Sequence, residues 1–118
     1  MCIRDRTETL GEFEQSVLLA IAHLIQANED VYGVSVRQVI ESRTGRSVPV
    51  GALYTALDRL ERKGYVSSEM GDPTPSRGGR AKRHFVLRPA GVAALERSRD
   101  YLARMWQGLA PISRRTRA

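Results

Sequence analysis

The sequence predicts a mainly α-helical fold with a small β-hairpin. Apolar residues recur at three- and four-residue spacing in four segments, whereas β-favouring residues gather in two short segments in the second half of the chain. Glycine and proline separate these two short segments from each other. With 118 residues, of which 42% are hydrophobic, the chain is long enough to bury one modest core.

Three helices are predicted ahead of the hairpin. The first covers residues 11–27, the second runs from Val34 to a left-handed cap at Gly45, and the third covers roughly residues 50–63 and ends at Gly64. Ser47 offers a hydroxyl cap to the third helix, and Pro49 suits a helix start. The apolar residues that predict these helices are Phe13, Val17, Ile21 and Leu24; Val34, Val36, Val39 and Ile40; and Leu53, Leu57 and Leu60.

The hairpin is predicted from residues 65–70 and 83–87, joined by a loop rich in glycine and proline. In the second strand, Phe85 and Leu87 share one face and return to the core. Pro89 suits the first turn of a final helix that reaches Leu109.

This order of elements predicts a winged helix-turn-helix domain over residues 10–88, a C-terminal dimerisation helix over residues 89–110 and a basic tail over residues 111–118. We expect residues 1–9 to form an N-terminal segment with a non-native start, because residues 1–6 resemble the translation of a library adapter.

The charge distribution points to a polyanionic partner. The net charge is +6 and the isoelectric point is about 10.2. Residues 73–95 contain no acidic residue but five basic ones. These are Arg77, Arg80, Lys82, Arg83 and Arg88. Four of them surround Gly78 and Gly79, which favour a sharp turn, so this loop is predicted to be a wing that contacts phosphates or a minor groove. The alternative is a solvated hairpin tip.

The third helix has the two faces that a DNA recognition helix needs. Its leucines point inward, while Gly51, Ala52, Thr55 and Arg59 form the opposite face and Tyr54 lies at the flank with a hydroxyl suited to a phosphate oxygen. The alternative is an ordinary amphipathic surface helix. The predicted contacts with double-stranded operator DNA are Ser47, Gly51, Ala52, Tyr54, Thr55, Arg59, Arg77, Gly78, Gly79, Arg80, Lys82 and Arg83.

Four motifs together resemble the PadR family of transcriptional regulators, over about residues 10–109. They are Gly51-Ala-Leu-Tyr54, the run from Leu57 to Gly64, Gly78-Gly-Arg80 and the run from Phe85 to Gly91. The resemblance implies a homodimeric repressor that binds a palindromic operator and is released by a small-molecule effector. Arg88 stands where such proteins carry a threonine as helix N-cap, so the last helix is expected to be frayed at its start.

The last helix carries a heptad pattern. Val92, Arg99 and Trp106 share one heptad position, and Leu95, Leu102 and Leu109 share the position three residues later. This pattern predicts a seam between two copies of the chain, the alternative being packing on the first helix. Arg99 would need an acidic partner such as Glu12, Glu14 or Asp100. In some PadR relatives a tryptophan of this helix lines a cavity for flat aromatic ligands, which makes Trp106 the candidate for a small aromatic effector; the alternative is a packing role.

Other classes of function are not expected. No apolar run is long enough to span a membrane and no signal peptide is recognisable, which predicts a cytoplasmic protein without a membrane partner. Cys2 is the single cysteine, so neither a disulfide nor a metal site is expected. No set of catalytic residues has a recognisable spacing, so we expect no enzyme and no cofactor. Two binding alternatives remain, a winged-helix module for protein partners without DNA binding and, last, a module for RNA or single strands, which the scarcity of aromatic residues disfavours.

Overall fold

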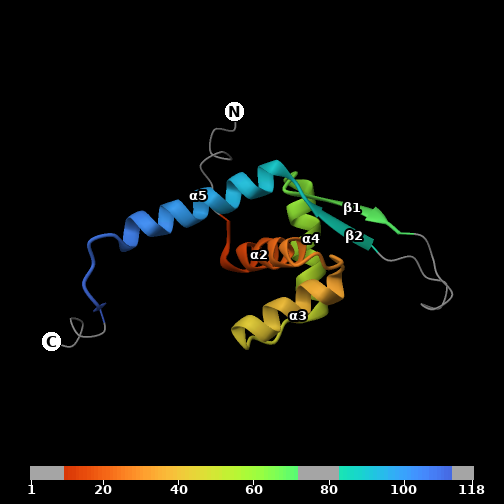
Figure 1. Ribbon diagram of the computed structural model, residues 1–118, viewed down its shortest axis with the longest axis horizontal. Helices are drawn as coiled ribbons and strands as arrows, with labels where there is room; N and C mark the ends of the chain where they lie inside the picture. The colour runs from red at the N-terminus through yellow and green to blue at the C-terminus, as the bar shows by residue number, and fades with distance from the viewer. Residues whose placement is uncertain (1–9, 72–82, 113–118) are drawn as a thin grey trace.

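The computed structural model describes residues 10–71 and 83–112 (Figure 1). Its elements follow the predicted order: helices α2 (Glu12–Gln26), α3 (Gly33–Thr44) and α4 (Val50–Arg62), strands β1 (Val66–Met70) and β2 (Arg83–Leu87), and helix α5 (Pro89–Trp106). The prediction of a mainly helical fold with one hairpin is therefore confirmed. The predictions for residues 1–9, for the tail beyond residue 112 and for Arg77, Gly78, Gly79, Arg80 and Lys82 of the wing lie outside the described residues.

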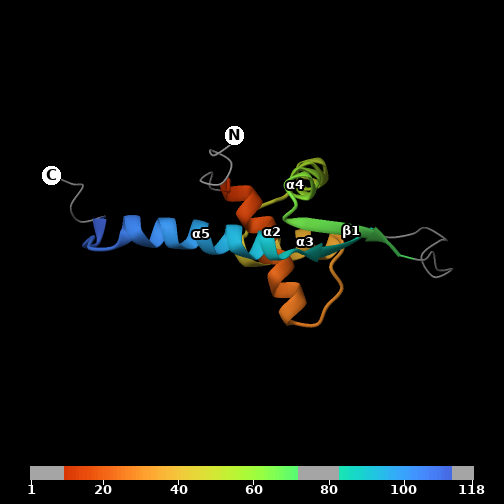
Figure 2. The ribbon, with the colours of Figure 1, turned by 90° about the horizontal axis from the view of Figure 1, so that it is seen from above.

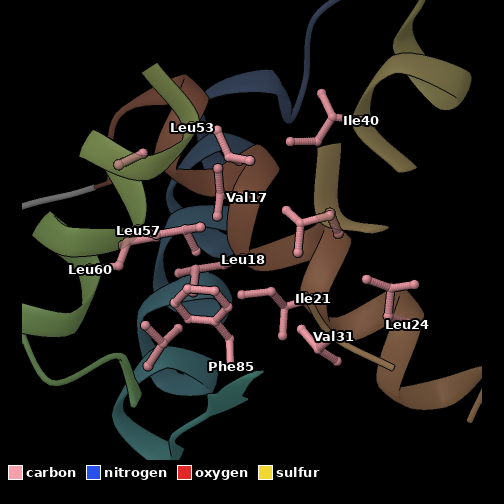
Figure 3. Packing of buried hydrophobic residues seen from close by; sticks show 14 of the residues in the cluster. Val17, Leu18, Ile21, Leu24, Val31, Ile40, Leu53, Leu57, Leu60 and Phe85 are labelled. Atoms are coloured by element: carbon pink, nitrogen blue, oxygen red, sulfur yellow. The ribbon is translucent and has the colours of Figure 1, made fainter. Parts of the chain in front are cut away.

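The core lies where α2 meets the other elements. Every predicted leucine of α4 is buried, and so are the predicted apolar residues of α2 except Phe13, which is half-buried. Figure 3 shows the ring of Phe85, from β2, beside Leu18 of α2 and near Leu57 of α4. A single cluster thus joins the three helices to the hairpin, which fixes α4 and the strands relative to each other.

Two details that the sequence predicts for α3 and α4 are wrong. Val34 is 56% exposed, because the buried face of α3 is formed by Val36 and Ile40. Ser47 does not cap α4, since the N-cap is Pro49 and no side chain caps this end.

The hairpin is antiparallel and is attached to the helices along one edge. The register pairs Val66 with Leu87 and Met70 with Arg83. On the other side of β2, the Phe85 amide donates to the Val31 carbonyl at 2.9 Å. The rings of Tyr32 and His84 meet edge to face next to this bond, with their centroids 5.6 Å apart. The connection between α2 and α3 therefore forms an isolated β-bridge with β2, which ties the hairpin to the helices.

Helix α5 has a docked half and a projecting half. Its buried residues are Gly91, Ala94 and Ser98, and the Ser98 hydroxyl accepts a hydrogen bond from the Leu10 amide at 3.4 Å. From Tyr101 onward every described residue is exposed. Figures 1 and 2 show this half extending away from the rest of the domain. None of the helices in ranges 10–71 and 83–112 is long and apolar enough to cross a membrane.

Both ends of α5 differ from the prediction. The helix stops at Trp106, because Gly108 takes a left-handed conformation with φ 83°, so Leu109 lies outside the helix instead of within a helix that reaches residue 110. The start is not frayed, because the Arg88 amide donates to the Tyr65 carbonyl at 2.9 Å and its carbonyl accepts from the Val92 amide at 3.1 Å. The fixed backbone angle of Pro89 assists this start without a side-chain cap.

Candidate nucleic-acid interface

The exposed face of α4 is narrow at its N-terminal end. Gly51, Ala52 and Thr55 are all exposed, and a Cβ added at Gly51 would meet no atom within 4 Å. The structure therefore brings together three of the predicted contacts on one open surface. Helical geometry places Asp58 and Arg62 on the same stripe as Gly51 and Thr55. Small side chains at the end of a helix allow a close approach to base edges in a major groove.

A hydrogen-bonded clamp holds the chain just before α4. Val48 is buried, its amide donates to Glu41 Oε2 at 2.8 Å, and its carbonyl accepts from Arg37 Nε at 2.7 Å. Arg37 and Glu41 also pair with each other, one turn apart on α3, at 3.6 Å. Sequence reasoning missed both residues. Their four-residue spacing is a signal of an ion pair, but nothing in the sequence identifies Val48 as their common partner.

Tyr54 lies away from the open surface. It is half-buried and packs on the core, and its hydroxyl faces Gly33 at the start of α3 closely enough that an added Cβ there would overlap it. Ser47 is exposed in the loop before α4. The structure thus separates Tyr54 from Thr55, although the two are neighbours in sequence.

Arg59 lies further along α4, on the side of α2. Its NH1 group is 3.6 Å from Glu14 Oε2, and Lys63 Nζ is 3.1 Å from Glu14 Oε1. Glu14 is buried, so these two cations compensate a carboxylate that would otherwise be costly to desolvate. The ion pair with Glu14 therefore neutralises part of the Arg59 charge within the domain.

Arg83 is also engaged inside the domain. Its guanidinium lies 2.6 Å from Glu61 and 3.2 Å from Asp58, and its Nε donates to Ser68 Oγ at 3.2 Å. Burial disfavours the charged form, but the hydrogen bonds and the attraction of Glu61 and Asp58 outweigh it and raise the pKa of Arg83 above its ordinary value. The structure therefore places Arg83 at the junction of β2 and α4.

Arg62 is a candidate that sequence reasoning missed. It is exposed on the stripe of Gly51 and Thr55, and within the described parts of the chain no hydrogen bond or ion pair engages it. The helical spacing from Thr55 was the available signal. An exposed cation on this face is suited to a phosphate oxygen.

The predicted seam on α5 is largely open. Val92, Leu102 and Trp106 are exposed, Leu95 is half-buried, and Arg99 is paired with the adjacent Asp100 at 3.4 Å. A groove of about 660 Å³ lies between α5 and α2, and most of its lining is apolar. The residues that line it are Gln15, Leu19, Ala22, Ile25, Gln26, Leu87, Val92, Leu95, Glu96, Arg99 and Leu102. Over residues 10–71 and 83–112, no cluster of histidine, cysteine or acidic side chains could hold a metal ion.

Comparisons with known proteins agree with this geometry. The sequence profile of the transcriptional regulator PadR-like family matches residues 21–97. The transcriptional regulator Rv3488 of Mycobacterium tuberculosis is 39% identical over 94 residues, which are 79% of this chain and 82% of that relative. A PadR family transcription regulator from Clostridium difficile has a similar structure, with a TM-score of 0.57 and 20% identity over 78% of this chain and 93% of its own. A winged-helix DNA-binding protein from STIV has a TM-score of 0.63 and 14% identity over 87% of this chain and 100% of its own.

Proposed function

This chain belongs to the PadR-like family of DNA-binding transcriptional regulators, and from that membership we propose that it is a homodimeric repressor of a palindromic operator, released by a small-molecule effector. Regulators of this family are not enzymes, so the function lies in binding. In this proposal α4 enters the major groove and the wing contacts the adjacent backbone.

The exposed face of α4 carries the proposal. Gly51, Ala52 and Thr55 are open on one side of the helix, while its leucines are buried on the other. The clamp on Val48 holds the start of this helix, so its small residues are presented in a fixed direction. Thr55 is the polar side chain best placed to read a base, and Arg62 is placed to contact a phosphate. The wing residues Arg77, Arg80 and Lys82 would add phosphate contacts.

The proposed dimer rests on α5. Its projecting half carries several large apolar side chains that are about half exposed or more, which is unusual for a surface without a partner. They are Tyr101, Leu102, Met105 and Trp106. Pairing of this half with a second copy would bury them and would place two α4 helices on one operator. An aromatic effector would bind beside Trp106 in this interface and change the spacing of the two domains.

Binding-site selection tests the proposal. The wild-type protein is used to enrich sequences from a randomised duplex library, and the enriched duplex is then footprinted. We expect two protected half-sites related by a palindrome, with centres separated by about one helical turn or a multiple of it. Failure to enrich any sequence would contradict the operator proposal.

A Thr55→Ala variant tests the role of α4. It should lose discrimination between the enriched duplex and single-base variants by about tenfold at the base that Thr55 contacts, while binding to a scrambled duplex changes little. Ser42→Ala is the control, because Ser42 is an exposed hydroxyl on α3 that donates to the Val39 carbonyl of its own helix. Equal losses on every duplex would show that Thr55 does not read bases.

A further inference from the structure

One polar cluster joins the recognition helix to both strands of the hairpin. Glu61 of α4 accepts from Arg83 of β2 at 2.6 Å and from the Ser68 hydroxyl of β1 at 2.8 Å. Ser68 in turn accepts from Arg83 Nε, and Arg83 also reaches Asp58, one turn before Glu61. These four side chains are the only ones among the described residues that connect α4 and the hairpin by ion pairs and side-chain hydrogen bonds.

Arg83 points toward the domain because of its place in the strand. Side chains two residues apart lie on the same face of a strand, so Arg83 shares the face of Phe85, which is fully buried. The guanidinium lies 5.0 Å from the centre of the Phe85 ring. The side chain is therefore packed on the core and fixed by two carboxylates, a setting in which it is not free to follow a phosphate.

The two carboxylates lie on or near the surface proposed to face DNA. Asp58 shares the exposed stripe of Gly51 and Thr55, and Glu61 lies between this stripe and the hairpin. An uncompensated acid on this stripe would repel the phosphate backbone. Arg83 therefore both compensates these charges and ties the start of β2 to α4.

We infer that Arg83, Glu61, Asp58 and Ser68 form a latch that sets the angle of the hairpin strands β1 and β2 to helix α4, so that Arg83 positions the DNA-binding surface instead of contacting DNA. The latch rests on the proposed binding of DNA by α4 and the wing. It replaces the phosphate contact that was predicted for Arg83 from the sequence.

The Glu61→Ala variant distinguishes the latch from a purely electrostatic effect of Glu61 on DNA binding. Glu61→Ala deletes a negative charge near the DNA, so charge alone would tighten binding. The latch makes the opposite prediction, a roughly fivefold weaker affinity of the folded protein for the enriched duplex. Glu69→Ala is the control: Glu69 is an exposed acid of β1 for which no ion pair is found within the described chain, and its removal should leave the affinity equal or slightly higher.

Exchange of the charges of Arg83 and Glu61 is the second test. Arg83→Glu and Glu61→Arg should each weaken binding, and the double variant should recover most of the loss because the pair is restored in reverse. A side chain that contacted phosphate itself would leave the double variant as weak as Arg83→Glu. Thermal unfolding of each variant is recorded as well, because a merely stabilising role would lower Tm and leave the affinity of the folded protein unchanged.

Three results would overturn the latch: Glu61→Ala binding as tightly as Glu69→Ala, a double variant without recovery, or a change in Tm alone. Failure of the operator proposal is distinguishable from these three results, because it would already be seen in the wild-type protein, which would enrich no sequence.

Discussion

At the scale of single residues, a close contact with Tyr54 accounts for the glycine at position 33. The Tyr54 ring lies across the first residue of α3, in the space that any side chain at position 33 would need. Gly33 is itself buried, and Tyr54 is half-buried and packs on the core. The contact joins α4 to the preceding helix at a closely packed point.

Gly33→Ala should therefore destabilise the protein, although alanine ordinarily favours a helix. We expect a loss of about 2 kcal/mol in the free energy of unfolding, because the added Cβ overlaps the Tyr54 hydroxyl and ring. Gly51→Ala is the matched control, since an added Cβ there meets no atom within 4 Å and should leave stability unchanged or raise it by about 0.5 kcal/mol. Urea titration of both variants measures the difference, and equal stabilities would contradict the contact.

At the scale of elements, periodicity and breakers predicted the helices and strands well. The buried leucines of α4 and the inward Phe85 followed from spacing alone. The end of α5 was not predicted correctly, because the heptad pattern continued past Gly108, which stops the helix.

The site was less predictable than the fold. A hairpin arginine beside a basic loop gives no sign that two acids of α4 will engage it, since only the packed structure brings Arg83 to Asp58 and Glu61.

The open stripe of α4 also leads us to expect a contact between Arg62 and a DNA phosphate. Arg62 lies on its open stripe, whereas Arg59 is partly used by Glu14. Arg62→Ala should weaken binding to the enriched and scrambled duplexes alike and lower the slope of log affinity against log salt by about one unit. Arg43→Ala is the control, because Arg43 is an exposed cation in the last turn of α3 and does not lie on the stripe of α4. Equal slopes for these two variants would remove Arg62 from the interface.

At the scale of the whole molecule, α5 belongs both to the core and to the proposed dimer. Ala94 and Ser98 complete the domain, and only the half from Tyr101 onward is free of it. The two proposed roles can therefore be separated by the point at which the chain is cut. A cut after Ala90 would expose the core, whereas a cut after Asp100 leaves every buried residue of α5 in place.

The chain cut after Asp100 should stay folded and become a monomer. It keeps α4 and the wing but binds only one half-site, so affinity for the enriched palindrome should fall by at least a hundredfold, while a single half-site is bound about as before. Sedimentation reports the mass, and far-ultraviolet circular dichroism reports the fold. A cut chain that remains a dimer, or a full-length chain that is a monomer at micromolar concentration, would contradict pairing through α5.

The hydrogen bond between Leu10 and Ser98 joins residues that are 88 positions apart. Chain segments so distant meet late, because closing a long loop costs entropy before any contact compensates it. The contacts among α2, α3 and α4 are far more local, so we expect these helices to assemble first and α5 to dock last.

A cavity made by Ala94→Gly should accordingly accelerate unfolding in stopped-flow experiments and leave the folding rate almost unchanged. The helix that carries the proposed dimer surface would then be the last to gain its orientation, and association of two chains would follow folding instead of guiding it.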